Sequence, residues 1–279
     1  MSYTEIKKRH LTFQKTLYQG AFSTVYKASW WETCMKWTDV AAKKVDKLDT
    51  KEIEIMSSLS HTNIVNLLGV VDESPEYYLI LELCSYRTLR EGLDKLIKCD
   101  NAQSRKELMK QVVKPLQYLK QKRIVHHEIT SQNYVFSSYD FGILKLTKFK
   151  RAEKIKITSE GKLESYPWTA PESLHEVEPF PTSDIFSLGV VLWEILTLQN
   201  PFQVSECAQI PAADEPEVKE AHHLPIPDDC PEQLAGMMKQ CWHKDWKKRP
   251  CIEHVVAVIT REEFTMPMYQ KSALKCIEM

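Results

Sequence analysis

Glycine is scarce in this sequence, with seven glycines among 279 residues, whereas the average usage of about 7% would give about twenty. An excess of one charge is also missing, because 37 Lys and Arg residues nearly balance 38 Asp and Glu residues. A net charge of -1 produces no field that would steer nucleic acid or an anionic membrane to the surface. We therefore expect neither nucleic-acid nor membrane partners.

Targeting and metal-site patterns are lacking as well. The polar start, MSYTEIKK, does not resemble a secretory signal, and no apolar run approaches the roughly eighteen residues that cross a bilayer. The eight cysteines include no C-x-x-C pair and no paired histidine spacing typical of zinc sites. Free thiols are typical of the reducing cytosol. We therefore predict a cytoplasmic protein without a metal site. The cysteines are Cys34, Cys84, Cys99, Cys207, Cys230, Cys241, Cys251 and Cys276.

The chain divides into a β-rich part and a helical part. Residues 11–83 contain β-branched and aromatic runs typical of strands. Helical periodicity follows, with apolar residues on one face at Leu108, Val112, Leu116 and Leu119. Because 279 residues exceed what one small core usually uses, two lobes are favoured. We predict an N-lobe at 1–84, a C-lobe at 85–261 and a tail or linker at 262–279.

Two of the helical segments have distinctive features. Pro115 lies inside the first, where proline removes a backbone hydrogen bond, so we expect a kink or a break there. Residues 185–198 are apolar on nearly every side except at Ser187 and Glu194. This pattern predicts a helix buried at the centre of the larger lobe.

Three motifs resemble those of the protein-kinase family. They are L-S-H-T-N-I-V at 59–65, Y-P-W-T-A-P-E at 166–172, and the stretch from C-W to R-P at 241–250. The resemblance spans residues 11–261 and is closest to the tyrosine-kinase-like branch, especially the mixed-lineage kinases with a leucine zipper and sterile-alpha motif. It implies an α+β, bilobal protein-kinase-like fold, with a small β-rich N-lobe, a larger helical C-lobe and a nucleotide site between them.

The resemblance assigns most of a nucleotide site. Lys43, in V-A-A-K, matches the strand lysine that holds phosphates, and Glu52 matches its helix partner, with Glu54 as the competing carboxylate. A buried ammonium needs such a carboxylate to offset its desolvation. The implied adenine site has Val25 and Ala41 above the base, Val135 below it, Leu81 as gatekeeper, and the backbone of Glu82 and Cys84 at the hinge. The implied internal stack consists of Leu67, Met56, Phe149 and His126.

The phosphate-binding loop at 17–25 departs from the family pattern. It keeps Gly20 but has Tyr18 and Ser23 where the family has glycine. Side chains at those two positions obstruct close approach of the backbone to phosphate. Tyr18 either lies over the nucleotide site or packs as an ordinary strand aromatic.

The catalytic loop reads H-H-E-I-T-S-Q-N at 126–133, against H-R-D-L-x-x-x-N in the family. Glu128 replaces the catalytic base, and its extra methylene moves the carboxylate by about 1 Å, enough to lower the rate roughly a hundredfold. His127 replaces the arginine that reads a phosphorylated activation segment, so control by such a phosphate is not expected. Asn133 is retained.

The metal-binding triplet is the most altered motif. In L-K-L-T-K-F-K at 144–150, Lys148 and Lys150 replace the aspartate and glycine of D-F-G. The letters D-F-G do occur at 140–142, seven residues after Asn133, but a β-hairpin between the two motifs needs about ten positions or more. We interpret the earlier triplet as a hairpin turn, with a shifted functional triplet as the alternative.

An ammonium at position 148 repels magnesium, which prefers carboxylate and phosphate oxygens. Lys148 would either pair with nucleotide phosphates beside Lys43, which we favour, or bridge to Glu52 or Glu128. The remaining motifs indicate structural roles: an ion pair between Glu172 and Arg249, and Asp184 at the base of the central helix. A basic activation segment is either a solvated face or a dock for an acidic partner. Its residues are Lys145, Lys148, Lys150, Arg151, Lys154, Lys156 and Lys162.

These observations lead to a pseudokinase hypothesis. The chain would bind ATP weakly or without Mg, and act in signalling through protein partners, either a related active kinase or a second copy of itself. One alternative is a weakly active serine/threonine kinase that uses Glu128 as base, with Asn133 or the triplet at 140–142 holding metal. Another is a structural domain that binds no nucleotide.

Overall fold

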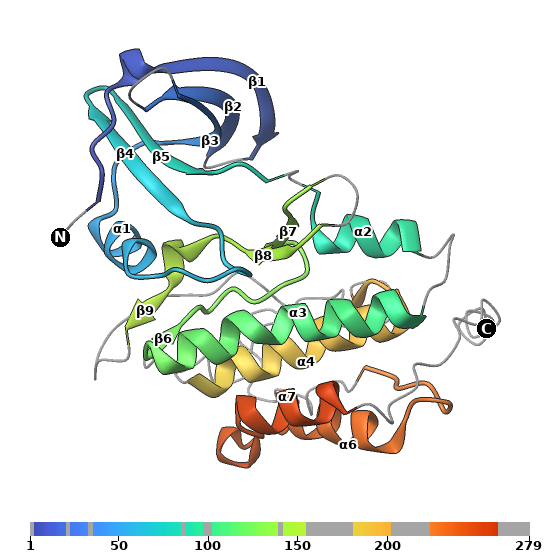
Figure 1. Ribbon diagram of the computed structural model, residues 1–279. Coiled ribbons are helices and arrows are strands. Elements are labelled where there is room, and N and C mark those ends of the chain that lie inside the picture. The colour runs from blue at the N-terminus through green and yellow to red at the C-terminus, as the bar shows by residue number, and fades with distance from the viewer. Residues whose placement is uncertain are drawn as a thin grey trace, which may run out of the picture.

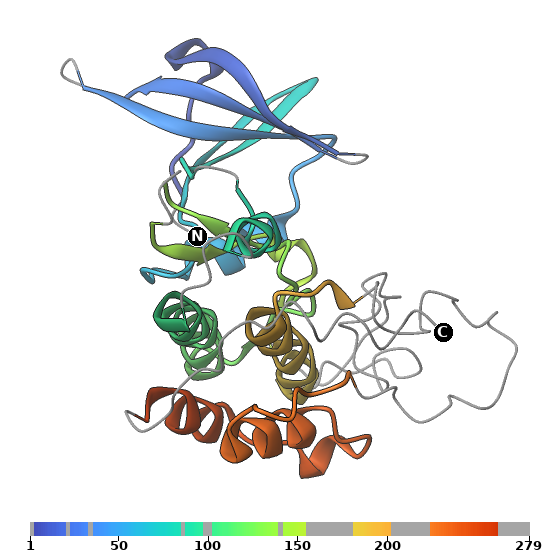
Figure 2. The same ribbon diagram turned by 90° about the vertical axis from the view of Figure 1, so that its right-hand side faces the viewer.

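The computed structural model describes residues 3–20, 23–32, 36–84, 87–96, 102–138, 142–154, 181–201 and 224–261. Within these residues a β-sheet lobe is followed by a helical lobe (Figures 1 and 2). The predicted α+β bilobal architecture is confirmed. The boundary at residue 84 stays a prediction, and the triplet residues 140 and 141, the motif at 166–172, and the tail at 262–279 lie outside the described residues.

A five-stranded antiparallel sheet forms the N-lobe, in the order β1-β2-β3-β5-β4. Its strands are β1 (Leu11–Gln19), β2 (Thr24–Trp31), β3 (Trp37–Val45), β4 (Leu67–Glu73) and β5 (Glu76–Glu82). Helix α1 (Thr50–Ser57) lies next to the sheet (Figure 1). The Asp49 side chain caps α1 by accepting from the backbone N–H groups of Lys51 and Glu52. This cap fixes the start of the helix that carries Glu52.

The N-terminal segment runs along the free edge of β4. Ile6 N–H donates to Val70 O at 2.8 Å, and Val70 N–H donates to Thr4 O at 2.9 Å. The approach is close, because a Cβ on Gly69 would lie 2.5 Å from Thr4 O. The segment thereby satisfies backbone groups that an edge strand would otherwise expose.

Helices build the C-lobe: α2 (Leu89–Leu96), α3 (Ala102–Gln121), α4 (Pro181–Thr197), α6 (Glu232–Cys241) and α7 (Ile252–Thr260). Helices α3 and α4 run side by side, and α6 and α7 pack below them (Figures 1 and 2). The prediction of a buried central helix is confirmed by α4, in which Leu188 and Trp193 have no exposed surface. Short 3-10 turns, η1 (Lys8–His10), η2 (Phe149–Arg151) and η5 (Trp246–Lys248), complete the described elements.

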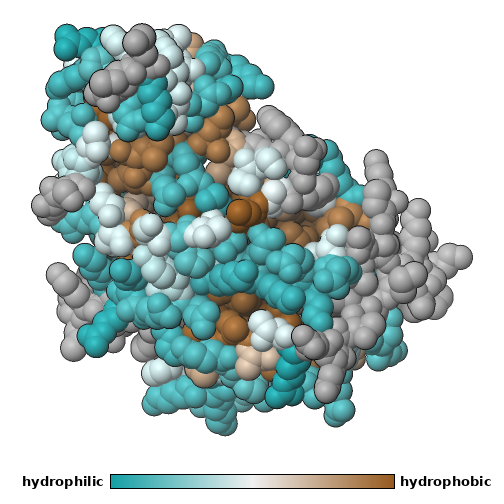
Figure 3. All heavy atoms as spheres, viewed as in Figure 1, coloured by the Kyte–Doolittle hydropathy of each residue, from teal (hydrophilic) through white to brown (hydrophobic). Residues whose placement is uncertain are grey.

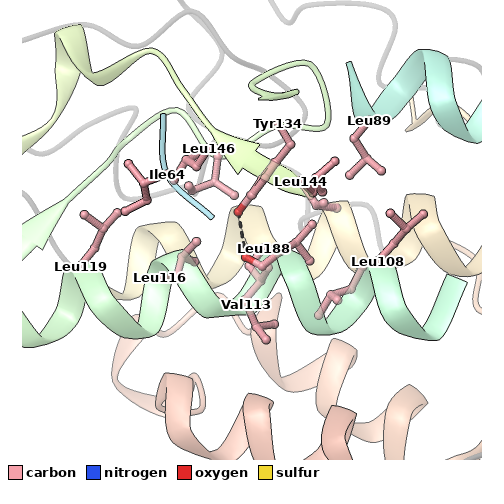
Figure 4. Close-up of a cluster of buried hydrophobic side chains, with 14 of the residues drawn as sticks. Ile64, Leu89, Leu108, Val113, Leu116, Leu119, Tyr134, Leu144, Leu146 and Leu188 are labelled. Atoms are coloured by element: carbon pink, nitrogen blue, oxygen red, sulfur yellow. Dashed lines mark hydrogen bonds between the residues drawn. The ribbon is translucent and has the colours of Figure 1, made fainter. Parts of the chain in front are cut away.

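Helix α3 continues through Pro115, so the predicted break there is wrong. Proline removes one N–H donor, but the surrounding packing keeps the helix intact. The Tyr134 hydroxyl donates to Val112 O at 2.9 Å, on the side of α3 that faces the hydrophobic cluster in Figure 4. Leu116 and Leu119 of the same helix are buried in that cluster. Tertiary contacts thus outweigh the local cost of the proline.

Two short strand pairs lie next to the central loops. Strands β7 (Tyr134–Phe136) and β8 (Leu144–Leu146) form the predicted hairpin, with Val135 opposite Lys145. Its turn is closed by Ser137 N–H donating to Ile143 O at 2.8 Å. Strands β6 (Ile124–Val125) and β9 (Glu153–Lys154) form a second pair. The hairpin sets residue 148, not residue 140, two residues after the end of β8.

Hydrophilic residues cover most of the face in Figure 3, and brown hydrophobic patches show mainly below the sheet and over the lower helices. No helix in the described part of the chain is both long and apolar enough to cross a bilayer. The cytoplasmic compartment stays a prediction. The large hydrophobic side chains exposed among the described residues are Tyr3, Tyr18, Trp31, Trp37 and Ile143.

Two helical glycines provide a matched test of the packing around α4. A Cβ on Gly189 would lie 2.7 Å from Trp242 Nε1 and 2.8 Å from Cys241 Cβ, whereas a Cβ on Gly236 in α6 would have no neighbour within 4 Å. We expect Gly189→Ala to lower the free energy of unfolding by about 1–3 kcal/mol through overpacking. Gly236→Ala should raise it by up to about 1 kcal/mol through helix propensity. Urea unfolding measures both, and equal effects would contradict the tight α4–α6 contact.

Candidate nucleotide site

The loop at 126–133 is held in place by the carboxylate of Asp184 at the start of α4. Asp184 Oδ2 accepts from His126 N–H at 2.7 Å, and Oδ1 accepts from His127 N–H at 2.9 Å. Burial raises the pKa of the Asp184 carboxyl, against the opposing effect of His127 and the two N–H donors. His127 has a left-handed φ of 67°. Asp184 therefore acts on the conformation of this loop, as expected for a structural carboxylate.

A second buried network ties the same loop to helices α2 and α4. Glu194 Oε1 accepts from Ser131 Oγ at 2.7 Å and from Arg90 Nη1 at 3.2 Å. Arg90 also donates to Leu198 O at 2.9 Å and Gln199 O at 2.7 Å. Glu194 has no exposed surface. Arg90 therefore offsets its charge inside the protein, and Ser131 adds a buried hydrogen bond.

Lys43 of β3 and Glu52 of α1 form the expected ion pair. Lys43 Nζ lies 2.9 Å from Glu52 Oε1, and their side chains are only 16% and 5% exposed. Glu54, the competing carboxylate, does not take this place. The pair connects the sheet to α1 and leaves the remaining protons of the Lys43 ammonium available for a second acceptor.

The residues assigned to the adenine site belong to one continuous hydrophobic cluster. Val25, Ala41, Leu81, Cys84 and Val135 are all buried in it. Ala41 and Leu81 lie opposite each other in the β3–β5 register. Burial raises the pKa of the Cys84 thiol to about 12, so this thiol is unreactive at neutral pH. All five are therefore core residues, and the adenine site that they would line stays a prediction.

The Glu82 side chain makes contacts that the sequence did not indicate. Lys145 Nζ of β8 lies 2.7 Å from Glu82 Oε1 and donates to Thr62 O at 2.8 Å. Asn66 Nδ2 donates to Glu82 Oε2 at 2.7 Å. The sequence predicts Lys145 on a basic surface, whereas in the structure Lys145 is paired with Glu82. The contacts join the end of β5 to the hairpin of the other lobe.

Tyr18 lies on the backbone of its own loop. A Cβ on Gly20 would meet the Tyr18 hydroxyl at 2.7 Å, and the tyrosine is 47% exposed. Gly20 N–H donates to Ser23 O at 3.0 Å, which closes the loop. The ring therefore covers the Gly20 backbone and does not pack as an ordinary strand aromatic. Gly20 provides space for this ring.

Lys148 follows β8 in a left-handed conformation, with φ 64° and ψ 65°. A lysine held there stores on the order of 1–3 kcal/mol of backbone strain. Its ammonium makes no hydrogen bond or ion pair with any of the residues that the structure describes, so the alternative bridge to Glu52 or Glu128 is not formed. Desolvation lowers the pKa of Lys148; Glu128 opposes this effect and Lys43 adds to it.

Glu128 is held by a residue that the sequence placed only in the basic segment. Arg151 Nε lies 3.3 Å from Glu128 Oε1. Asn133 Nδ2 donates to the Glu128 carbonyl at 2.7 Å, so the Asn133 amide supports the loop. No signal in the sequence indicates this pair, because Arg151 and Glu128 lie in separate segments of the chain.

His126 and Phe149 form the lower half of the expected internal stack. Their rings meet edge to face with centroids 4.8 Å apart. His126 Nε2–H donates to Thr147 O at 3.0 Å, and its Nδ1 accepts from Glu128 N–H at 3.2 Å. Met56 of α1 is buried, and Leu67 packs against the same hydrophobic core. The scaffold is assembled although the charged positions have changed.

The described part of the basic segment is mixed in character. Lys150 and Lys154 are exposed, while Glu153 of β9 pairs with Lys51 of α1. Lys156, Lys162 and Glu172 lie outside the described residues, and Arg249 donates to Thr182 O at 3.0 Å and to His243 O at 3.0 Å. Docking of an acidic partner stays a prediction.

Magnesium does not fit the residues at this site. The ion needs oxygen ligands, but position 148 presents an ammonium, which leaves the Asn133 Oδ1 as the matching oxygen ligand among the described residues while its Nδ2 donates to Glu128 O. Within the described residues, no three His, Cys, Asp or Glu side chains are grouped to hold a metal ion. Lys43 and Lys148 are close enough for their charges to interact, and nucleotide binding there stays a prediction.

Comparison with known proteins gives the family. The family model described as protein tyrosine and serine/threonine kinase matches residues 11–259. This chain belongs to that kinase family. The match covers both lobes and the site around Lys43 and Lys148.

The similar proteins include kinases of more than one kind. The chain is 30% identical over 223 residues to mitogen-activated protein kinase kinase kinase dlk-1 of Caenorhabditis elegans, covering 77% of this chain and 23% of that protein. It is 27% identical over 269 residues to the tyrosine-protein kinase transforming protein Abl of Abelson murine leukemia virus, covering 90% and 34%.

The human tyrosine-protein kinase FRK is 28% identical over 265 residues, covering 89% of this chain and 50% of that protein. The chain therefore spans between about a quarter and a half of the length of these three relatives. Because both a mitogen-activated kinase kinase kinase and tyrosine kinases match, placement in the mixed-lineage branch stays a prediction.

Burial of His126 makes stability depend on pH. Desolvation lowers the pKa of His126 to about 3, with Thr147 O opposing this and with His127 and Lys148 adding to it. The unfolded chain binds a proton near pH 6.5 that the folded chain does not, so stability is complete above pH 6.5 and falls as the pH drops toward 3.

At pH 5 the loss is about 2 kcal/mol. His126→Gln keeps an N–H donor for Thr147 O and removes the titration. Urea unfolding gives the free energy of unfolding at pH 7 and at pH 5. The difference between these two values should be about 2 kcal/mol smaller in the variant than in the wild type. An unchanged difference would contradict a buried neutral imidazole.

Proposed function

We propose that this chain is a pseudokinase that binds a nucleoside triphosphate such as ATP without a divalent cation and transfers phosphate poorly or not at all. The Lys148 ammonium, which has no hydrogen bond or ion pair among the described residues and feels the charge of Lys43, carries the proposal. Two cations so placed take over part of the charge neutralisation that magnesium provides in active kinases.

Three features oppose phosphate transfer. The metal carboxylate is replaced by Lys148, the base position is a glutamate bound to Arg151, and Tyr18 covers the backbone of the phosphate loop at Gly20. Metal ions and an oriented base supply most of the catalysis in this reaction. Losing them together leaves binding as the activity that the site favours.

A weakly active serine/threonine kinase is the second candidate. The intact Lys43–Glu52 pair and the His126–Phe149 contact favour it, because both belong to an assembled kinase scaffold. In this case Glu128 would act as the base after release from Arg151, with Asn133 or Asp140 holding metal.

Signalling by a kinase-like protein without turnover depends on binding to other proteins. We expect a related active kinase or a second copy of this chain as partner, and no nucleic acid or membrane. Sedimentation velocity across a range of concentrations separates a monomer from a self-associating chain.

Metal-free nucleotide binding is tested by thermal unfolding with ATP in EDTA. At an ATP concentration tenfold above Kd, we expect the wild type to gain about 3–6 °C. Lys148→Asn removes the ammonium but tolerates the left-handed backbone. Losing one charge-assisted hydrogen bond should weaken binding about tenfold or more and reduce the gain to about 1 °C.

Lys150→Asn is the matched control, because it removes the same charge from an exposed neighbour. This control should keep the wild-type gain. No gain in the wild type would refute metal-free nucleotide binding, and equal losses in both variants would refute the specific role of Lys148.

Phosphate transfer distinguishes the second candidate. The account predicts that radiolabelled ATP and Mg²⁺ yield no phosphorylation of a generic protein substrate above that of Lys43→Met. Incorporation that Lys43→Met abolishes, and that a mock purification lacks, would establish the weak kinase instead.

A further inference from the structure

The two carboxylates near Lys148 are each paired with another cation. Glu52 is occupied by Lys43 at 2.9 Å, and Glu128 is occupied by Arg151 at 3.3 Å. Among the described residues these are the carboxylates that resemblance and geometry set near the phosphate position. Within the part of the chain that the structure describes, Lys148 is thereby left as a cation without a direct partner.

Glu128 is the carboxylate that competes for Lys148. It is close enough to raise the pKa of Lys148, although desolvation, the largest effect, lowers that pKa and Lys43 adds a smaller lowering. Glu128 is 19% exposed and Arg151 30% exposed, so their attraction is only partly screened by water. If Glu128 were released, the nearest cation without a carboxylate would be Lys148.

The local backbone explains how Glu128 stays paired with Arg151 and does not pair with Lys148. Lys148 precedes the 3-10 turn η2 in a left-handed conformation, and Arg151 is the last residue of that turn, whose end is fixed by Ala152 N–H donating to Phe149 O at 3.0 Å. Phe149, which lies between them in the sequence and is buried, anchors the turn against His126. Arg151 contacts Glu128 at 3.3 Å, and Glu128 is also close enough to act on the charge of Lys148.

We infer that Arg151 is a positioning residue for the nucleotide site: by binding Glu128 it keeps the Lys148 ammonium available to the phosphates of a nucleoside triphosphate. This role rests on the proposed metal-free nucleotide binding, and it names Arg151 as the residue that controls the strength of that binding. Glu128, at the position of the catalytic base in the family, thus serves as the counter-ion of Arg151. The nucleotide phosphates serve as the counter-ion of Lys148.

Three variants test this role with ATP in EDTA by isothermal titration calorimetry. Arg151→Gln should release Glu128 to Lys148 and weaken ATP binding by about three- to tenfold, the effect of a partly exposed ion pair in competition. Adding Glu128→Gln to that variant should restore the wild-type Kd. Lys150→Gln removes the same charge from the same turn, and it should change the Kd by less than about twofold.

A second measurement needs no nucleotide. Reductive 13C-methylation of the lysines allows the pKa of Lys148 to be followed by NMR, with the Lys148→Asn spectrum for assignment. The pKa of Lys148 should rise in Arg151→Gln, because Glu128 then pairs with it, and should fall again when Glu128→Gln is added.

The outcomes separate the two ideas. No ATP binding by the wild type in EDTA would reject the proposed function, while the NMR titration would still decide whether Arg151 holds Glu128. An unchanged pKa of Lys148 in Arg151→Gln, a failure of Glu128→Gln to restore binding, or an equal loss in Lys150→Gln would each overturn the role of Arg151 and leave metal-free binding intact. Circular dichroism confirms that each variant is folded.

Discussion

The structure around the site depends on one constraint, which is that an ammonium group stands where a kinase presents a carboxylate to metal. Lys148 occupies a left-handed position two residues after the end of β8. Lys43 pairs with Glu52, and Arg151 pairs with Glu128. In the proposed function this arrangement suits phosphate and not magnesium.

The framework that holds this site does not depend on the altered residues. Asp184 fixes the backbone of His126 and His127, and Glu194 joins Ser131 to Arg90, all through buried hydrogen bonds. These contacts involve neither metal nor nucleotide. A kinase fold can therefore keep its shape after its catalytic charges have changed, and its stability and its chemistry are largely separate properties here.

Much of the fold could be predicted from the sequence, because the controlling physics is local. The minimum length of a hairpin places residue 148 after β8, and the desolvation cost of Lys43 requires a carboxylate partner, which Glu52 provides. The apolar sequence of α4 likewise indicates a buried helix. In these cases spacing or residue type alone limits the possible arrangements.

Other contacts could not be predicted in this way, because they join distant segments or depend on side-chain direction. Lys145 reaches Glu82 only once the two lobes are packed together. Arg151 reaches Glu128 through the geometry of a single 3-10 turn. Pro115 shows the limit of propensity, since packing around α3 preserves a helix that the residue itself disfavours.

A crystal structure of the protein with a non-hydrolysable ATP analogue, grown once in EDTA and once with Mg²⁺, tests the central claim most directly. The account predicts, in both crystals, a phosphate oxygen within about 3 Å of Lys148 Nζ and no metal ion beside it. A magnesium ion held by Asn133 or Asp140, with the Lys148 ammonium turned away from the phosphates, would contradict it.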